Sequence, residues 1–462
     1  MRNELKSLIF ATVAMGCGDS GGRADSISGT GGVSVTVTTP ATSSDTTPTD
    51  GSATAAVTSS GTEGSASNSQ GDTTVGVSTV PTTDDDGGIP KSDLGKQPDF
   101  GAPGCGGGMG GGGDDPDFSY IWIANSAQNT MSKIDTQTLV EKGRYWVRPD
   151  NLGNPSRTSV NLSGDVVIAS RDGGFTKFYA RIEDCKDTNG TPGIQTAVDG
   201  NMLAFDQEEC RAWHTPMAYI SQRPAAWTQG NLNLATCKYE NQKVWTSGNN
   251  LQNGTVDVLL VNGDTGAIES LVTVSGIMAD YYGIYGAAVD NEGNFWGSQL
   301  GQGYLVNVNL QTLQVKTWPM VAGGYGMTVD SKGYVWTCSA NASRFDPKTE
   351  TWQTNTVGGN GGCMEDGKGT LYMGGYANGV PAIVAVDTET LQVKATYPVP
   401  QYTHGISIDF YGYVWGVSMG TEAYRVDVTM GGAIQTFSGL VGAYTYSDMT
   451  GFALSNVGMP SG

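Results

Sequence analysis

Residues 325–336 read Tyr-Gly-Met-Thr-Val-Asp-Ser-Lys-Gly-Tyr-Val-Trp, and they contain a spacing, Asp-x-x-Gly-x-x-aromatic, that occurs four times in the chain. The four copies are Asp290/Gly293/Trp296, Asp330/Gly333/Trp336, Asp366/Gly369/Tyr372 and Asp409/Gly412/Trp415. Their Asp residues lie 40, 36 and 43 positions apart, which is the repeat length of a four-stranded propeller blade. One blade cannot bury both of its faces alone. We therefore expect the blades to stack radially around a central channel.

Each copy also predicts the local structure of a blade. The residues before the Asp, such as 327–329, form a short apolar run that is typical of an inner strand. Asp and Gly then turn the chain, because an Asp side chain bonds the backbone that follows it and Gly accepts a positive φ. A second strand ends on the aromatic residue, and the alternation in residues 391–395 is typical of an outer strand. The expected fold class is all-β.

Weaker copies of the pattern extend toward the N-terminus and predict seven blades. Residues 120–122 begin a first blade, Asn161/Gly164/Val167 keeps the turn spacing in a second, and residues 244–245 belong to a third. The first blade lacks an inner strand, whereas residues 450–455 resemble an inner strand with nothing after it. We predict a seven-bladed β-propeller over residues 118–456, closed by a C-terminal strand that enters the first blade. Six or eight blades are the alternative, because a long insertion interrupts the second and third blades.

The N-terminal part of the chain has a different composition and predicts export. Residues 1–17 open with Arg2 and Lys6, continue with an apolar run and end on small residues before Cys17, which resembles a bacterial lipoprotein signal peptide. Residues 18–117 are mostly Gly, Ser, Thr, Asp and Pro and cannot bury a core. We expect a lipid on Cys17, a disordered tether, and a propeller held at the outer membrane or surface of a Gram-negative-type bacterium. An ordinary cleaved signal with a coincidental Cys is the alternative.

The charge balance limits the partners. The chain of 462 residues has a formal net charge of −20, so neither nucleic acid nor an anionic membrane face is an expected partner. No other segment approaches the run of about 18 apolar residues that a membrane-spanning helix needs. The membrane is therefore expected to be contacted only through the lipid anchor. The propeller, followed by a short tail at 457–462, is expected to be monomeric.

The cysteines fit an oxidising compartment. Setting Cys17 aside leaves six of the seven cysteines, an even number that permits disulfides. Cys338 follows the second strand of one blade, and Cys363 lies on the inner strand of the next, so a disulfide between them would join neighbouring blades. Cys105 and Cys237 either pair or stay free.

An insertion at 183–215, between the second and third blades, is expected to be clamped by a disulfide between Cys185 and Cys210. Its sequence resembles the calcium loop of EF-hand-like and dockerin-like proteins, in which oxygen ligands alternate along the chain. The candidate metal ligands are Asp187, Asn189 and Thr191. Because Thr replaces an acidic ligand and a Pro follows where the turn Gly belongs, a surface loop that binds no ion is the alternative.

The repeat sequences at 325–336 and 404–415 resemble those of the streptogramin lyase (virginiamycin B lyase) propellers and of the related NHL-repeat propellers. The resemblance covers residues 118–456 and implies the propeller fold. In the lyase family, His residues in loops at the channel mouth, together with carboxylates and a magnesium ion, open a cyclic depsipeptide ester by elimination. The resemblance therefore implies a carbon–oxygen lyase with a histidine base and Mg.

The positions five residues before each repeat Asp are expected to face the channel mouth. They hold Ser156, Tyr285, Tyr325, Gly361, His404 and, in the closing strand, Thr450. Elimination needs a base and an electrophile in defined positions, and His404 is the only candidate catalytic residue among them. His214, the second histidine of the chain, lies in the insertion. Because no two-histidine arrangement is visible, we expect no turnover of streptogramin-type depsipeptides.

The tyrosines near the mouth predict a binding site instead. The candidate binding residues are Tyr282, Tyr285, Tyr325, Tyr402, His404 and Tyr444. With Asp280 and Asp448 near them in sequence, these rings would suit a small molecule, a glycan or a peptide. Packing between strands is an equally simple use of tyrosine, and the repeat tryptophans are expected to pack between blades. The leading hypothesis is a lipid-anchored propeller that binds a ligand or an envelope protein. A lyase-like enzyme that uses His404 and a structural surface scaffold are the alternatives.

Overall fold

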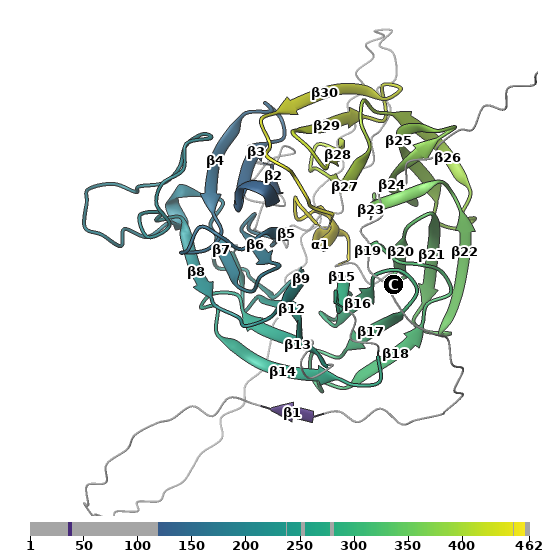
Figure 1. The fold of residues 1–462 in the computed structure, drawn as a ribbon, viewed down its shortest axis with the longest axis horizontal. Coiled ribbons are helices and arrows are strands. Elements are labelled where there is room, and N and C mark those ends of the chain that lie inside the picture. The colour runs from purple at the N-terminus through teal and green to yellow at the C-terminus, as the bar shows by residue number, and fades with distance from the viewer. Residues whose placement is uncertain are drawn as a thin grey trace, which may run out of the picture.

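The computed structural model describes residues 36–38, 119–236, 238–250, 255–277, 281–446 and 448–457. In this part of the chain, antiparallel sheets surround one axis like the blades of a fan (Figure 1). Seven sheets form blades, and an additional two-stranded hairpin lies beside the third. The predicted seven-bladed, nearly all-β propeller is therefore confirmed.

The blades follow one another in chain order, and each runs from an inner to an outer strand. Blade one contains β2 (Tyr120–Asn125), β3 (Thr130–Asp135) and β4 (Glu141–Trp146). Blade two contains β5 (Pro155–Val160), β6 (Val166–Ser170), β7 (Phe175–Phe178) and β8 (Arg211–Thr215). Blade three contains β9 (Ser221–Trp227), β12 (Lys243–Asn250), β13 (Thr255–Asn262) and β14 (Ile268–Val274). The short strand β1 (Thr36–Thr38) pairs with β14. A hairpin of β10 (Asn231–Asn233) and β11 (Lys238–Glu240) lies between β9 and β12 in the sequence.

The last four blades are regular four-stranded meanders. Blade four contains β15 (Ile284–Val289), β16 (Phe295–Gln299), β17 (Tyr304–Val308) and β18 (Val315–Pro319). Blade five contains β19 (Gly326–Val329), β20 (Val335–Cys338), β21 (Asn341–Asp346) and β22 (Thr351–Thr356). Blade six contains β23 (Gly359–Glu365), β24 (Thr370–Ala377), β25 (Val380–Asp387) and β26 (Val393–Pro398). Blade seven contains β27 (Thr403–Ile408), β28 (Val414–Ser418), β29 (Glu422–Asp427) and β30 (Ala433–Ser438).

Helices are short in the described residues. They are two 3-10 turns, Ser126–Gln128 and Ile182–Asp184, and the helix α1 (Phe452–Asn456). Within the described ranges, no helix is long and apolar enough to cross a membrane.

The repeat Asp closes the turn between the first two strands of a blade and also holds the aromatic residue. One oxygen of Asp330 accepts the backbone N–H groups of Lys332 and Tyr334, at 2.9 Å each, and the other accepts the indole N–H of Trp336 at 2.8 Å. The same indole bond joins two further pairs at 2.8 and 2.7 Å, Asp290–Trp296 and Asp409–Trp415. The six-residue spacing therefore has a direct physical cause, since it aligns a carboxylate with an indole donor.

The ring closes through the C-terminal segment, but not through the residues that we expected. Trp122 donates its backbone N–H to the carbonyl of Met449 at 2.9 Å, and Asn125 forms a bridge with Ala443. Residues 443–446 and 448–449, which we call the closing segment, thus lie beside β2, where blade one lacks an inner strand. Residues 450–455, predicted as the closing strand, instead turn at Gly451 (φ 87°) and enter helix α1.

Helix α1 lies near the axis of the ring (Figure 1). We use two names for the ends of the channel. The turn end is the end at which the inner strands run into the repeat turns, and the mouth is the opposite end. At the turn end, Asn456 donates its side-chain N–H to the carbonyl of Glu365, and the carbonyl of Leu454 accepts a bond from Gln229. A cavity of about 40 Å³ remains between α1 and the inner strands. The helix therefore fills most of the channel at its turn end.

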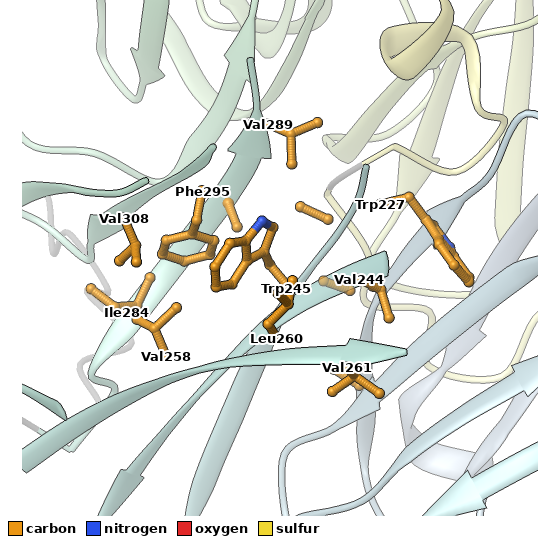
Figure 2. Close-up of a cluster of buried hydrophobic side chains, with 14 of the residues drawn as sticks. Trp227, Val244, Trp245, Val258, Leu260, Val261, Ile284, Val289, Phe295 and Val308 are labelled. Carbon is orange, nitrogen blue, oxygen red and sulfur yellow. The ribbon is translucent and has the colours of Figure 1, made fainter. Parts of the chain in front are cut away.

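The core lies between neighbouring blades. Trp245 of blade three packs against Phe295 of blade four, with ring centroids 5.8 Å apart, and Val244 and Val258 lie beside the same cluster (Figure 2). Trp336 has no exposed surface and packs with residues of blade six, among them Leu371. The repeat aromatics thus bond within their own blade and pack against the next.

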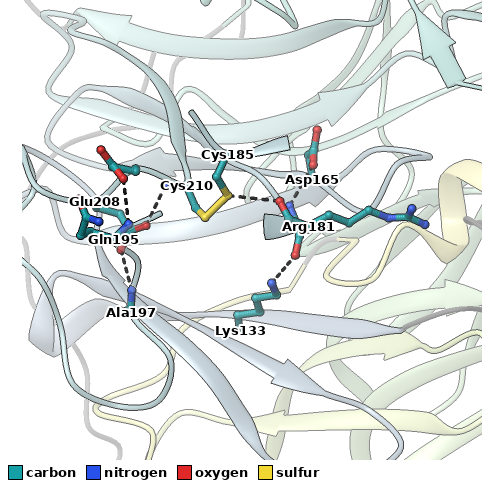
Figure 3. The surroundings of a disulfide bond; sticks show 10 residues. Lys133, Asp165, Arg181, Cys185, Gln195, Ala197, Glu208 and Cys210 are labelled. Atoms are coloured by element: carbon teal, nitrogen blue, oxygen red, sulfur yellow. Dashed lines mark hydrogen bonds between the residues drawn. A yellow bond between two sulfur atoms is a disulfide. The ribbon is translucent and has the colours of Figure 1, made fainter. Parts of the chain in front are cut away.

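Both predicted disulfides are present. Cys338 on β20 is bonded to Cys363 on β23, so the bond joins blades five and six as expected. Cys185 is bonded to Cys210, and the Glu208 carboxylate beside this disulfide accepts the backbone N–H of Cys210 at 2.9 Å (Figure 3). Disulfides of this kind are typical of extracellular or periplasmic proteins.

The insertion lies in a different place from the one that the sequence suggested. It connects β7 to β8, so it interrupts blade two itself and does not separate blades two and three. In Figure 1 it is the long loop that extends outward beside β7 and β8. Ala197, in its middle, is buried in a cluster with Trp122 and Tyr145 of blade one. The predicted lipidation residue Cys17, the tether apart from β1, Cys105, Cys237 and Asp280 lie outside the described residues.

Candidate functional site at the channel mouth

Irregular strand pairing positions the side chains at the mouth. The pairing of β15 with β16 shifts register between Ile284 and Gly286, and that of β27 with β28 shifts between Thr403 and Gly405. Tyr285 and His404 therefore occupy bulge positions near the start of their inner strands. Because a bulge bends the strand and redirects a side chain, residues that would otherwise face the neighbouring blade can point across the channel.

The structure brings the predicted mouth residues into one hydrogen-bonded cluster. The Tyr285 hydroxyl donates to the Tyr325 hydroxyl at 3.1 Å and lies 2.5 Å from the hydroxyl of Tyr444. Tyr325 in turn contacts both Tyr444 and the Nε2 atom of His404 through its hydroxyl. The other ring nitrogen of His404, Nδ1, lies 3.1 Å from the Tyr402 hydroxyl. Residues from blades four, five and seven and from the closing segment thus share one network.

Further aromatic rings surround this network. Tyr446, which is fully buried, stacks on Tyr285 at 5.3 Å with an interplanar angle of 9°. Tyr282 meets the edge of Tyr285 at 5.7 Å, and Tyr402 stacks on Tyr376 at 5.4 Å. Tyr376 is exposed, and both Tyr282 and Tyr402 are partly exposed. These three rings therefore form an accessible aromatic surface.

Three arginines complete the cluster, and the sequence analysis missed all of them. Arg157 has no exposed surface; it lies 3.5 Å from the ring centroid of Tyr446 and donates to the carbonyl of Tyr325 at 3.5 Å. Because Arg157 comes from blade two and Tyr325 from blade five, its side chain crosses the channel. The other two guanidinium groups are those of Arg171, 4.2 Å from the Tyr444 ring centroid, and Arg223, 4.9 Å from that of Tyr285.

The arginines could have been found from two signals. Arg157 directly follows the expected mouth residue Ser156, and the pairing of β5 with β6 shifts register at that point. Arg223 lies in a similar irregularity of β9, next to Gln222, but β9 was not recognised as the inner strand of blade three. Both residues occupy the same level of the channel as Tyr285 and His404.

The surroundings keep the imidazole of His404 and the hydroxyls of Tyr285 and Tyr325 neutral. Burial, with Arg157 and Arg171 nearby, lowers the pKa of His404 from 6.5 to about 3. Burial raises the pKa of the hydroxyls of Tyr285 and Tyr325 well above the usual range. At neutral pH the imidazole is therefore uncharged and the phenols stay protonated.

The remaining predicted mouth positions have other roles. Gly361 lies against the next inner strand, because a Cβ atom there would come within 2.8 Å of the His404 carbonyl. Thr450 is not at the mouth, since its hydroxyl donates to the carbonyl of Ile408 at the turn end. Asp448 is also directed to the turn end, where its carboxylate accepts the backbone N–H of Gly451 at 2.9 Å and burial raises its pKa to about 6. These two corrections follow from the helical course of the chain after residue 451.

His214 is likewise remote from the mouth cluster. It lies on β8, the outer strand of blade two, and its Nδ1 atom is 2.8 Å from the hydroxyl of Thr176. Burial, with Arg148 and Arg211 nearby, lowers its pKa to about 4. The structure therefore does not combine the two histidines of the chain in one site.

The predicted metal ligands of the insertion are used by the loop itself. Asp187 accepts the backbone N–H of Gly190 at 2.7 Å, and Asn189 accepts that of Thr191 at 2.7 Å. Within the described ranges, no group of three or more His, Cys, Asp or Glu residues is arranged to hold a metal ion. These oxygens stabilise turns in the manner of Asx motifs, and ion binding by the loop stays a prediction.

No protein-family model matches the chain. No curated protein matches it either. Similar solved structures include apo AztD from Citrobacter koseri, with 10% sequence identity and a TM-score of 0.46 over 72% of this chain and 98% of that one. They also include the β-propeller domain of Cps50 (Swd1) from Myceliophteria thermophila, with 10% identity and a TM-score of 0.44 over 64% and 89%. A functionally unknown protein from Desulfotomaculum acetoxidans has 9% identity and a TM-score of 0.49 over 71% and 100%. The resemblance to streptogramin lyases therefore stays an expectation drawn from the repeats.

Proposed function

We propose that this protein is a ligand-binding module of the cell envelope, and that its ligand binds at the mouth of the propeller channel. The observation that carries the proposal is the cluster of Tyr285, Tyr325, His404 and Tyr444, which converge from separate blades and the closing segment. Packing alone does not require polar rings from four distant segments to share hydroxyl contacts. Aromatic rings with few, directed polar groups are the usual lining of small-molecule and peptide sites.

The chemistry of His404 favours binding over catalysis. Its two ring nitrogens contact the hydroxyls of Tyr325 and Tyr402, so neither faces a carboxylate that would orient it as a base. A general base works best when its pKa lies near the operating pH, whereas the pKa of His404 is lowered to about 3. We therefore assign His404 to the ligand surface and not to an elimination reaction.

The test of the binding proposal is a ligand screen of the purified full chain by thermal shift. Glycans, short peptides and aromatic small molecules are the probes, because a ligand that binds only the folded state raises the melting temperature. Affinity for a hit should fall in Tyr402→Ala and Tyr282→Ala. Tyr239→Ala is the matched control, since Tyr239 is also partly buried but lies on the hairpin beside blade three at the turn end.

Two outcomes of this screen would contradict the proposal. One is a hit whose affinity is unchanged in both mouth variants, which would place the site elsewhere. The other is turnover of a depsipeptide that is abolished by His404→Ala, which would establish the lyase-like enzyme instead.

We further propose that the propeller is anchored to the envelope by a lipid on Cys17. The small residues before Cys17 and the polar stretch at 18–117 support this, and both disulfides fit an exported chain. Cys17→Ser should move the protein from the membrane fraction to the soluble fraction. A variant that stays in the membrane fraction, or a mature N-terminus mapped to another residue, would contradict the anchor.

A further inference from the structure

We propose that the mouth is an anion site and that its ligand is an organic oxyanion, a carboxylate or phosphate ester with an apolar body, bound by Arg157, Arg171 and Arg223. This inference rests on the proposed function, because it names the class of ligand for the same site. It adds to that function because it assigns ligand binding to three arginines. None of the three arginines was among the predicted binding residues.

The first argument is the concentration of positive charge in an acidic protein. The chain has a net charge of −20, yet three guanidinium groups contact one group of tyrosines at the mouth. Among the described residues, none of the three forms an ion pair with a carboxylate. The charged groups that act on His404 are Arg157 and Arg171, so positive charge dominates this end of the channel.

The second argument is that some of the guanidinium donors have no protein partner. The Nε and Nη1 atoms of Arg157 and the Nε atom of Arg171 are buried without a hydrogen-bond partner among the described residues. A buried unpaired charge is strongly unfavourable. The tyrosines around Arg157 do not neutralise it, because burial raises the pKa of the Tyr446 hydroxyl and keeps this phenol protonated. The positive charge is therefore uncompensated until an anion binds.

Geometry favours contact with Arg171 and Arg223, with Arg157 beneath them. Arg157 has no exposed surface and Arg223 is 6% exposed, whereas Arg171 is partly exposed. An oxyanion above the cluster can accept bonds from Arg171 and from tyrosine hydroxyls, and the buried charge of Arg157 adds to the attraction. Guanidinium groups are well suited to this, since their planar donors match carboxylate and phosphate oxygens.

The surroundings of the mouth suit the apolar body of such a ligand. Tyr376 is 40% exposed and stacks on Tyr402. Other exposed apolar side chains lie in segments that connect strands at the same end of the propeller; they are Leu152, Ile220, Val321 and Met419. An inorganic anion would use only the arginines, whereas an organic anion would also contact exposed rings such as Tyr376.

The inference is tested by calorimetric titration of the full chain with four probes. Phenyl phosphate and benzoate carry an oxyanion and a ring, inorganic phosphate carries only the anion, and benzyl alcohol carries only the ring. We expect the first two to bind and benzyl alcohol to bind at least about tenfold more weakly, since it lacks the negative charge that strengthens hydrogen bonds to guanidinium groups. Inorganic phosphate should bind more weakly than phenyl phosphate, and added salt should weaken all anion binding.

Arginine variants separate this inference from the proposed function. Arg171→Gln and Arg223→Gln should each weaken phenyl phosphate about tenfold or more. Lys316→Gln removes the same charge from β18, where Lys316 pairs with Glu350 on the outside of the propeller, and should change nothing. If benzyl alcohol binds as tightly as the anions and only Tyr402→Ala weakens it, the anion inference fails and the proposed function stands. If Tyr402→Ala affects no ligand at all, both fail.

Arg157→Met gives an independent readout in the absence of ligand. If Arg157 is kept for binding, replacing its unpaired charge by an apolar chain should leave the melting temperature unchanged or raise it, and should abolish anion binding. A lower melting temperature together with unchanged anion affinity would show a structural role and overturn the inference.

Discussion

The two ends of the central channel are built in different ways. At the turn end, the carboxylate of Asp409 finds all of its partners within six residues, including the indole of Trp415, and helix α1 fills the space between the blades. At the mouth, the partners of Tyr325 come from residues up to 168 positions away, and some buried arginine donors have no hydrogen-bond partner among the described residues. The comparison indicates that stability is concentrated at the turn end and that the mouth retains unsatisfied groups for a ligand.

The largest expected effect is at the turn end. Asp409→Ala removes the acceptor of two partly buried backbone N–H groups and of the buried Trp415 indole. We expect a loss of about 3 to 5 kcal/mol in the free energy of unfolding, measured by urea denaturation. Asp366→Ala is the matched control, because Asp366 binds only the backbone of its turn, at Lys368 and Thr370, and should cost about 1 to 2 kcal/mol. Equal losses in the two variants would contradict the role of the indole bond.

The second prediction concerns the disulfide between blades five and six. The double variant Cys338→Ser/Cys363→Ser should lower the free energy of unfolding by about 2 to 4 kcal/mol, because the disulfide restricts the unfolded chain. Thermal unfolding measures the loss, and a reducing agent should affect the variant less than the wild type. Peptide mapping without reduction should link Cys338 to Cys363, and a link to any other cysteine would contradict the order of the blades.

The third prediction uses the pH dependence of the mouth. His404 has a pKa of about 3 in the folded protein and about 6.5 when unfolded. Because the unfolded chain takes up the proton first, the contribution of the neutral imidazole is complete above about pH 6.5 and is lost as the pH falls toward 3. The stability difference between wild type and His404→Gln should change by about 2 kcal/mol between pH 7 and pH 5.

This pH effect belongs to the imidazole and its neighbours. The groups that face it are the hydroxyls of Tyr325 and Tyr402, the Tyr444 ring and the charges of Arg157 and Arg171. Urea denaturation at both pH values gives the difference directly. Tyr372→Phe, in the repeat of another blade, should show a difference that does not vary with pH. A constant difference for His404→Gln would show that the imidazole is not desolvated.

The smallest effect is expected for a single hydroxyl at the mouth. Tyr285→Phe removes the contacts to Tyr325 and Tyr444 but keeps the ring that stacks on Tyr446. Its free energy of unfolding should fall by only about 0.5 to 1.5 kcal/mol. A loss as large as that of Asp409→Ala would mean that the mouth, too, is a structural element.

The repeat turns could be predicted from the sequence, because their interactions are local. The spacing from Asp330 to Trp336 specifies the turn, the strand that follows and the residue that packs on the next blade. The inter-blade disulfide followed from the same register. The sequence analysis placed the closing segment too late in the chain. The apolar pattern at 450–455 suggested a strand. The Asp448 carboxylate instead accepts the backbone N–H groups of Gly451 and Leu454, and these bonds favour a helix.

The mouth could be predicted only in part. Counting back from the repeat Asp located Tyr285, Tyr325 and His404, because these blades keep the same offset. The count fails for blade two, where the shift after Pro155 places Arg157 in the channel, and for blade three, whose inner strand carries no repeat Asp. Such bulges depend on contacts between blades, and these contacts cannot be predicted from the spacing of residues within one repeat.

The closure of the ring also determines the order of events during synthesis. Blade one is made first, but it acquires its inner segment only when the residues from Ala443 to Met449 that the structure describes, 443–446 and 448–449, are available to bond β2. Until then the backbone of β2 presents an unpaired edge, of the kind that recruits other chains. Such long-range pairing forms slowly, so an incomplete chain is exposed to association with its own copies until the ring closes.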